Sequence, residues 1–196
     1  MSVVLVDAGG TNIGSVRYAL QRLGVDAALT ADARTIRVAD KVILPGVGAA
    51  GPGMARLREL GLVDVLRSLN QPVLGVCLGM QLLCTHSEEG DTACLGLLPA
   101  SVRRFAGLPG LRVPHMGWNS LCAKSAHPLL AGLGEHDQAY FVHSYAVPVG
   151  DFTLASSDYA GEFSAVVARG NFHGMQFHPE RSAAVGAQLL KNFLNL

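Results

Sequence analysis

A cysteine and a distant histidine–carboxylate pair have the residue types of nucleophilic catalysis. Cys77 lies between Gly75 and Gly79 in "PVLGVCLGMQ", after an apolar run and before a helix-like one. This is the setting of a nucleophile elbow, a strained turn whose neighbours two residues away have no room for a Cβ. The N–H groups that open the next helix favour a thiolate. The motif alone also fits a small, buried, unreactive thiol, and that alternative stays open.

A nucleophilic cysteine needs a base, and His178 in "GMQFHPERS" is the best placed of the seven histidines. If the chain is extended there, His178 and Glu180 point to the same side. The carboxylate can then hold the Nδ1–H of the imidazole and leave Nε2 to take the thiol proton. The alternative is a turn before the last helix, with Glu180 in the first helical turn.

An oxyanion hole needs backbone N–H groups beside the nucleophile. In the elbow geometry Leu78, which follows Cys77, supplies one of them. Val47 and Gly48 in "PGVG", at the end of another predicted strand, can supply the second, because ligands gather beyond the carboxyl ends of parallel strands. Taken alone, "PGVG" is equally an ordinary turn between a strand and a helix.

Alternating strands and helices are expected to position these groups. "VVLVD" at 3–7, a run near 25–29, "KVILPGVG" and "QPVLGVC" have the texture of buried parallel strands, and helical spacing recurs over 16–23 and 54–69. After about residue 95 the runs are shorter and few helices separate them, which favours antiparallel additions. We therefore expect an open, flavodoxin-like α/β sheet, mainly parallel in the first half, with helices on both faces.

The last segment, "SAAVGAQLLKNFLNL", predicts an amphipathic helix with Ser182 as its N-cap. The chain of 196 residues contains no evident linker or repeat, so we expect a single domain over 1–196.

Net charge is zero and no basic stripe occurs, which argues against nucleic acid or an anionic membrane as partner. Four cysteines without a C-x-x-C pair indicate neither a disulfide framework nor a zinc site. Without a leader-like N-terminus, a cytoplasmic protein is the simplest expectation.

Taken together, these motifs resemble the class I, or triad, glutamine amidotransferases. "GVCLGMQ" is similar to the nucleophile motif of that family, "FVHSY" to its glutamine-contacting strand and "QFHPERS" to its histidine–glutamate motif. "LPGVG", "PHMGWN" and "LLKNFL" further resemble the glutaminase subunits of imidazole glycerol phosphate synthase, which acts in histidine biosynthesis. The resemblance covers essentially the whole chain.

The resemblance implies a role for each matching residue. Cys77 attacks the side-chain amide of glutamine, His178 passes the proton to the leaving ammonia, and Glu180 orients His178. No cofactor or metal is implied. The positions that match the glutamine site are Gly46, Gln81, His143, Ser144 and Tyr145. For His143 and Ser144, the alternating polarity of a half-buried strand is an equally good explanation from the residues alone.

The same resemblance implies a protein partner. In this family ammonia enters a cyclase subunit with a (β/α)₈ barrel, and the resulting heterodimer makes imidazole glycerol phosphate and an aminoimidazole carboxamide ribonucleotide. Trp118, Asn119 and Tyr140 match positions that face the cyclase. A single tryptophan is a good interface anchor, although a core position would suit it as well. We also expect the glycines around Val47 to let the oxyanion peptide stay inactive until the cyclase is liganded.

One loop departs from the family pattern. The first loop of the family commonly reads D-Y-G-x-G-N-L, whereas this chain has "DAGGTNIGS", with Ala8 for the tyrosine and Thr11 for the second glycine.

Three other functions remain open on the residues alone. They are an amidotransferase subunit for anthranilate or aminodeoxychorismate synthesis, a non-catalytic binding module on the same sheet, and a cysteine hydrolase acting on peptides or esters.

Overall fold

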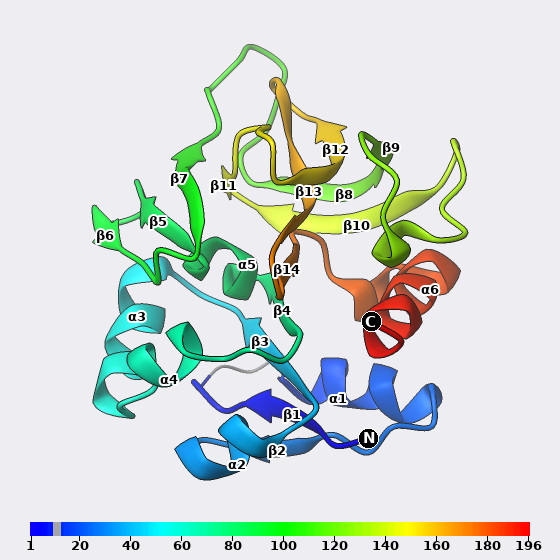
Figure 1. The fold of residues 1–196 in the computed structure, drawn as a ribbon. Helices are drawn as coiled ribbons and strands as arrows, with labels where there is room; N and C mark the ends of the chain where they lie inside the picture. Colours follow the sequence, from blue (N-terminus) through cyan, green and yellow to red (C-terminus); the bar gives the residue numbers. More distant parts are fainter. Residues whose placement is uncertain (10–12) are drawn as a thin grey trace.

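A mixed β-sheet forms the centre of the molecule (Figure 1). The computed structural model describes residues 1–9 and 13–196, and within them the largest sheet has the strand order β2-β1-β3-β4-β14-β13-β12-β9. In that order the strands are Ala28–Thr30, Val3–Val6, Lys41–Gly46, Val73–Cys77, Phe172–Met175, Glu162–Arg169, Thr153–Asp158 and Cys122–Ala123. The first five pair in parallel and the remaining pairs are antiparallel, which confirms the predicted division of the sheet.

Helices cover both faces of this sheet, as expected. One apolar core joins the strands to α1 (Ile13–Arg22) and α6 (Ala183–Leu194). The other joins them to α2 (Ala33–Val38), α3 (Ala50–Glu59), α4 (Val63–Arg67) and α5 (Leu78–Leu82). In Figure 1, α1 and α6 lie to the right of the parallel strands and α3 and α4 to the left. Neighbouring strand residues such as Val42 and Ile43 enter opposite cores, because successive side chains of a strand alternate between its faces.

Two smaller sheets flank the carboxyl ends of the central strands. β8 (His115–Ser120) pairs antiparallel with β10 (Gln138–His143). A second sheet has the order β11-β7-β5-β6, with bounds Tyr145–Ala146, Leu98–Arg104, Cys84–Ser87 and Thr92–Ala93. The segment "FVHSY", which the resemblance implied to be one strand, divides at Ser144 between these two sheets. Ser144 and its neighbours therefore lie where the two sheets meet.

The strand β14 departs from the antiparallel character of the second half. It pairs in parallel with β4, and Met175 lies opposite Val76 in the register. Both strands therefore end at the same edge of the sheet. Cys77 follows Val76 directly, and His178 lies three residues after Met175, so residues about 100 positions apart in the chain meet at this edge.

The structure corrects one predicted helix and decides between the two conformations left open after His178. The helix expected over 54–69 is two helices, α3 and α4, separated by a turn in which Gly61 has a φ of +66°. After His178 the structure has the turn that the sequence left open as the alternative to an extended chain, a 3-10 turn, η2, over Pro179–Arg181 with Glu180 in it. The proline supports that turn, because its fixed φ suits the first position of a helical turn.

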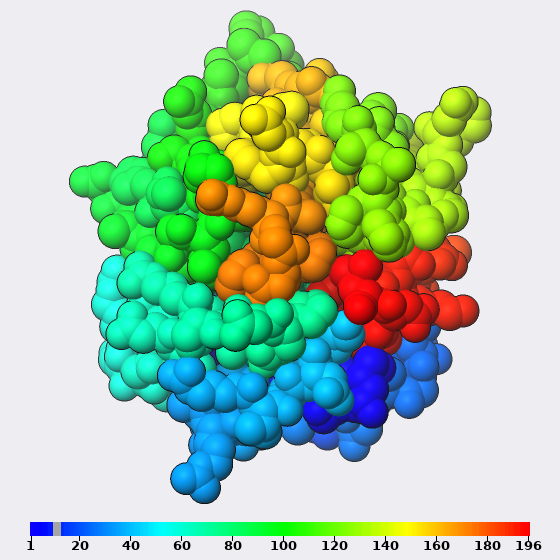
Figure 2. Space-filling view, viewed as in Figure 1, coloured from blue at the N-terminus to red at the C-terminus, as the bar shows by residue number. Residues whose placement is uncertain are grey.

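The last helix begins at Ala183, as the sequence indicated, but Ser182 does not cap it with its side chain. Figure 2 shows the C-terminal segment between the N-terminal segment and residues from the middle of the chain, in agreement with the packing of α6 against the 3-10 turn η1 (Pro128–Leu130). In the part of the chain that the structure describes, no helix has the length and apolarity to cross a bilayer. Ala8 packs against the second core, and Thr11 lies outside the described residues.

Candidate active site

Cys77 lies on a strained turn at the end of β4. Its backbone has φ 54° and ψ −113°, and the next residue, Leu78, is the first residue of α5. A positive φ is uncommon for a residue with a side chain, and such residues concentrate at functional sites. The buried-thiol alternative requires no such backbone. The elbow predicted around Cys77 is therefore present in the structure.

Three glycines make this turn possible because the backbone passes too close for a Cβ. A Cβ on Gly79 would lie 1.9 Å from the carbonyl oxygen of Leu44. A Cβ on Gly75 would lie 2.6 Å from the backbone of Gly79, and one on Gly46 would lie 2.6 Å from the Gly79 nitrogen. Gly46 also lies opposite Cys77 in the β3–β4 register. The G-x-C-x-G spacing and the glycine of "PGVG" thus satisfy one packing requirement, the close approach of β3 to the elbow.

His178 and Glu180 form the predicted pair. The Nδ1 of His178 lies 2.9 Å from Oε1 of Glu180, and both side chains are buried. Burial alone would lower the pKa of His178, but hydrogen bonds with Cys77 and Glu180 and the negative charge of both groups raise it to about 10. An imidazolium beside the sulfur stabilises a thiolate. The pairing was predicted from an extended chain, whereas the η2 turn produces it.

Ser182 holds His178 in place. Its hydroxyl donates to the His178 carbonyl at 2.7 Å and accepts the Tyr140 N–H at 2.9 Å, and the His178 N–H donates to the Tyr140 carbonyl at 3.0 Å. Ser182 is fully buried. Its hydroxyl, which the sequence suggested as a helix cap, instead fastens the histidine segment to β10.

A cavity of about 330 Å³ opens beside the elbow. Nine of its lining residues were predicted for the site: Val47, Gly48, Cys77, Leu78, Gln81, His143, Ser144, Tyr145 and His178. Gly46 is not among the lining residues. It borders two other cavities next to the "PGVG" loop, the larger of which is also lined by Ala8. The structure therefore gives Gly46 a role in packing rather than a place on the cavity wall.

A buried glutamine that the sequence analysis did not select connects two site residues. Gln176 is fully buried, and its Nε2 donates to the Cys77 sulfur at 3.9 Å. Its Oε1 accepts from Gln81 Nε2 at 2.9 Å, and Gln81 Nε2 also donates to the Tyr145 carbonyl at 2.9 Å. Gln81 thus directs both N–H groups into the protein, which leaves its carbonyl oxygen to face a ligand. The sequence contained a signal for Gln176, because this residue lies two positions before His178.

Glu89 is the second residue that the sequence analysis missed. It lines the cavity and accepts the Ala50 N–H at 2.8 Å. Nothing in "SEEGD" singles it out, because a glutamate in a polar turn is ordinary. Only the folded chain brings this carboxylate to the cavity that Cys77 also lines.

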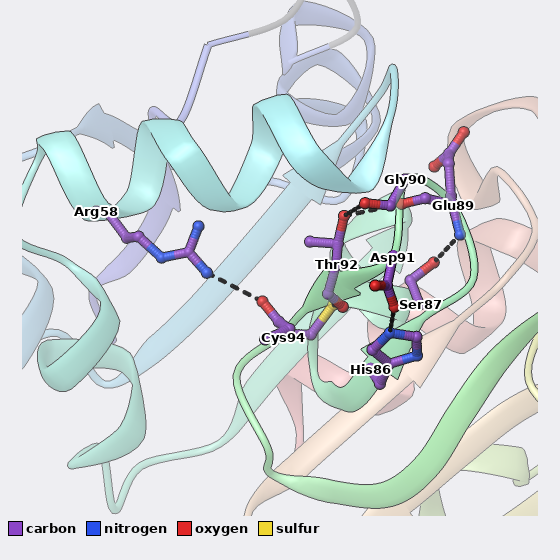
Figure 3. A network of polar contacts seen from close by, with 9 residues as sticks. Arg58, His86, Ser87, Glu89, Gly90, Asp91, Thr92 and Cys94 are labelled. Atoms are coloured by element: carbon purple, nitrogen blue, oxygen red, sulfur yellow. Dashed lines mark hydrogen bonds and ion pairs between the residues drawn. The ribbon is translucent and has the colours of Figure 1, made fainter.

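The turn between β5 and β6 that carries Glu89 is held by side-chain hydrogen bonds (Figure 3). The Glu89 N–H donates to Ser87 Oγ, and Thr92 Oγ1 donates to the Glu89 carbonyl at 2.8 Å. His86 Nε2 lies 2.8 Å from Asp91 Oδ1 across the same turn. Arg58 of α3 reaches across to the Ala93 carbonyl at 3.1 Å. These contacts tie the turn to α3 and restrict the position of the carboxylate.

The residues predicted to face a partner lie on opposite faces of the two-stranded β8–β10 sheet. Trp118 is half exposed and packs edge-on against Tyr140. The guanidinium carbon of Arg181 lies over the Tyr140 ring, 4.7 Å from the ring centroid. Asn119, the next residue of β8, points to the opposite face and donates to the Asp158 carbonyl. We call Trp118, Tyr140 and Arg181, together with the exposed Met116, the Trp118 face. Asn119 does not belong to it.

Comparisons with known proteins agree with this fold. The family model described as glutamine amidotransferase class-I matches residues 4–196. The chain is 59% identical over 194 residues to the imidazole glycerol phosphate synthase subunit HisH of Xanthomonas axonopodis pv. citri, covering 99% of this chain and 97% of that protein. It is 58% identical to the subunit of that name from Xylella fastidiosa, with the same coverage.

Solved structures share the fold at low sequence identity. A crystal structure of a protein from Thermoplasma acidophilum, described as part of a putative GMP synthase, superposes with a TM-score of 0.77 at 20% identity, covering 100% of this chain and 92% of that chain. Another, described as a glutamine amidotransferase, has a TM-score of 0.77 at 23% identity, covering 100% of this chain and 98% of that chain. At these identities the likeness concerns the fold alone.

The mixed sheet, the elbow and the family match together define a class I glutamine amidotransferase. Within that class the chain belongs to the HisH family, the glutaminase subunits of imidazole glycerol phosphate synthase in histidine biosynthesis. This membership disfavours the peptidase or esterase and the non-catalytic module that the residues alone left open.

Proposed function

We propose that Cys77, His178 and Glu180 form a catalytic triad that hydrolyses glutamine to glutamate and ammonia. The observation that carries the proposal is the shared cavity of Cys77 and His178, with Glu180 2.9 Å from the far nitrogen of the imidazole. A nucleophile, a base and a group that orients the base are the parts that acyl transfer requires. All three belong to the one domain that we assign to residues 1–196.

The reaction proceeds in two steps. The Cys77 sulfur attacks the side-chain amide carbon of glutamine, and the proton held on His178 passes to the amide nitrogen, which leaves as ammonia. Water then attacks the thioester, giving its proton to His178, and the sulfur leaves as glutamate is released. The N–H of Leu78 stabilises the oxyanion of both tetrahedral intermediates, since a first-turn helical N–H has no partner within its helix. The peptide between Val47 and Gly48 supplies the second donor.

Glutamine is recognised at its α-amino and α-carboxylate groups. We assign the α-ammonium to the carboxylate of Glu89 and the carbonyl oxygen of Gln81, both of which line the cavity. A buried charge needs a partner of opposite sign, and Glu89 supplies it. The segment of His143, Ser144 and Tyr145 lines the same cavity and holds the substrate through its backbone and side-chain donors.

The partner is a cyclase subunit with a (β/α)₈ barrel, in a heterodimer located in the cytoplasm. The relatives named as synthase subunits support an assembly with a second chain. We place the contact at the Trp118 face, where an exposed tryptophan, an exposed methionine and an arginine stacked on Tyr140 have the composition of interface anchors. Ammonia crosses to the cyclase, which makes imidazole glycerol phosphate and the aminoimidazole carboxamide ribonucleotide.

The "PGVG" loop restrains the reaction until the cyclase holds its ligand. Gly48 has a φ of +100°, a conformation that glycine adopts freely, so the adjacent peptide can rotate at little steric cost. If the isolated subunit hydrolysed glutamine as fast as the liganded complex, this regulation would be excluded.

Glutamate release from glutamine by the purified complex tests the proposal. Wild-type protein with the cyclase and its nucleotide ligand should release glutamate, and Cys77→Ala should release none. Cys122→Ala is the matched control, because Cys122 is an exposed free cysteine outside the cavity. Full activity in Cys77→Ala would contradict the triad. Stimulation by an anthranilate or aminodeoxychorismate synthase, and not by the cyclase, would contradict the assigned partner.

A further inference from the structure

A chain of hydrogen bonds, buried at its centre, runs from β8 to the cavity wall. Asn119 Nδ2 lies 3.4 Å from His115 Nε2, and His115 Nδ1 lies 3.1 Å from His143 Nε2. The chain ends where His143 Nδ1 lies 2.8 Å from the Tyr145 carbonyl oxygen. His115 and His143 are 3% and 6% exposed, so neither depends on bulk water for its partners. We call these three side chains the histidine relay.

The direction of every bond in the relay is determined. A carbonyl oxygen only accepts, so His143 is protonated at Nδ1. Burial lowers the pKa of His143 to about 3 and that of His115 to about 4, so both rings are neutral at neutral pH. The Nε2 of His143 therefore accepts, and His115 donates to it from Nδ1. The Nε2 of His115 in turn accepts from Asn119.

Asn119 cannot reverse this direction. Its amide nitrogen also donates to the Asp158 carbonyl at 2.8 Å, and its Oδ1 accepts the Ser120 N–H at 2.9 Å. A flipped amide would place oxygen against the Asp158 oxygen and NH₂ against the Ser120 N–H, so both bonds would be lost. The relay thus has a single satisfied arrangement.

Aromatic packing keeps the His115 ring in its plane. It stacks on Tyr159 with centroids 4.0 Å apart and on Phe141 at 5.1 Å. His115 also lies directly opposite His143 in the β8–β10 register. Aromatic stacking therefore holds the faces of the His115 ring, and hydrogen bonds hold its edges. These two contributions can be separated by mutation.

The relay meets the active site at one atom. The Tyr145 carbonyl accepts from His143 and from Gln81, and Gln81 continues to Gln176 and the Cys77 sulfur. Two donors on one carbonyl fix the position of that peptide, and with it the rotamer of Gln81 on the cavity wall.

We propose that His115 is a positioning residue for glutamine binding: by donating to His143 it fixes the Tyr145 carbonyl, which orients the Gln81 carboxamide toward the substrate. The inference rests on the proposed function, because it takes glutamine as the ligand of the cavity. His115 itself does not line that cavity.

Two substitutions separate the hydrogen bond of His115 from its packing. His115→Phe keeps a ring between Tyr159 and Phe141 but removes the donor. His115→Asn removes the ring but places an amide N–H where Nδ1–H stood. His173→Phe is the matched control, because His173 is buried to the same degree and lies outside the cavity.

In the complex with the cyclase, His115→Phe should raise the KM for glutamine about tenfold and change kcat less than threefold. His115→Asn should keep a KM within about threefold of wild type while its Tm falls further than that of His115→Phe. The control should keep the wild-type KM. A wild-type KM in His115→Phe, or KM changes that follow the loss of Tm in all three variants, would overturn the inference.

The tautomers of His115 and His143 can be determined without an activity assay. ¹⁵N NMR of histidine-labelled protein should show both His115 and His143 protonated at Nδ1 and not at Nε2. A His143 protonated at Nε2 would overturn the relay. If the wild-type complex hydrolysed no glutamine, the proposed function would fail instead, and this spectrum would still decide the relay.

Discussion

Gln176 lies with its Nε2 3.9 Å from the Cys77 sulfur and its Oε1 2.9 Å from Gln81 Nε2. One buried carboxamide thus donates to the proposed nucleophile and accepts from a residue of the cavity wall. A donor that faces the sulfur stabilises negative charge there, and hydrogen bonds to charged groups are stronger than neutral ones.

Replacing Gln176 with glutamate is therefore expected to slow the reaction. Gln176→Glu keeps the shape and the acceptor for Gln81, but it loses the donor to sulfur and adds a like charge. We expect kcat to fall about 10- to 100-fold, which corresponds to about 1.5–3 kcal/mol. The alkylation rate of Cys77 by iodoacetamide, measured across pH, should shift to higher pH. Gln21→Glu on the exposed side of α1 is the control, and an unchanged alkylation profile in Gln176→Glu would refute the role.

Glu89 is expected to contribute to substrate binding rather than to chemistry. Glu89→Gln removes the charge proposed to face the α-ammonium but retains an oxygen for the Ala50 N–H. The KM for glutamine should rise about 10- to 100-fold with little change in kcat. Steady-state kinetics of the complex measure this split. Glu135→Gln, on an exposed loop, is the control and should behave as wild type. An unaltered KM in Glu89→Gln would show that this carboxylate does not bind the α-ammonium group.

Gly79 is expected to tolerate no side chain. The Cβ of Gly79→Ala would lie 1.9 Å from the Leu44 carbonyl oxygen, so β3 or α5 would have to move. Overpacking of this kind typically costs about 1–3 kcal/mol or more. The Tm should fall by several degrees and activity should be lost, as thermal unfolding and the glutaminase assay would record. Gly107→Ala is the matched control, because nothing lies within 4 Å of its Cβ and its φ is not positive. Equal Tm values for the two variants would show that the elbow can relax.

Stability is expected to decrease in mild acid. Burial lowers the pKa values of His115 and His173 to about 4 and that of His143 to about 3. The unfolded chain therefore binds protons near pH 6.5 that the folded chain does not. The contribution of these histidines to the free energy of unfolding is therefore complete above pH 6.5 and decreases as the pH drops toward 4. Each such histidine contributes a slope of up to about 1.4 kcal/mol per pH unit.

His178 acts in the opposite direction. Its pKa is raised to about 10, so its contribution is complete below pH 6.5 and is lost as pH rises through 10. Urea unfolding at pH 7, 6 and 5 isolates the effect of the neutral histidines. His115→Asn should flatten the dependence by the share of one group, and an identical slope would mean that His115 is protonated in the folded protein.

Several elements of the first half were predictable because local pattern specifies them. Short apolar runs that end in glycine predicted β1, β3 and β4, and the G-x-C-x-G spacing predicted the strained turn at Cys77. The turn between α3 and α4 was missed because apolar spacing continues across Gly61, where only the positive φ interrupts the helix. The hairpin of β5 and β6 was missed because its strands are very short, and with it Glu89 was missed.

The sequence by itself determined the proposal for the chemistry: a cysteine between two glycines, and a histidine two residues before a glutamate, predict a nucleophile and its base by residue type and spacing. Tertiary structure decided which distant residues touch. Gln176 and Cys77 are 99 positions apart, and they meet because β14 pairs in parallel with β4 at one register. Asn119 was expected beside Trp118 on the partner face, but side chains alternate along β8, so it turns inward to His115. Local spacing specifies the turns, whereas contacts across the sheets depend on register and side-chain direction, which only the packed chain defines.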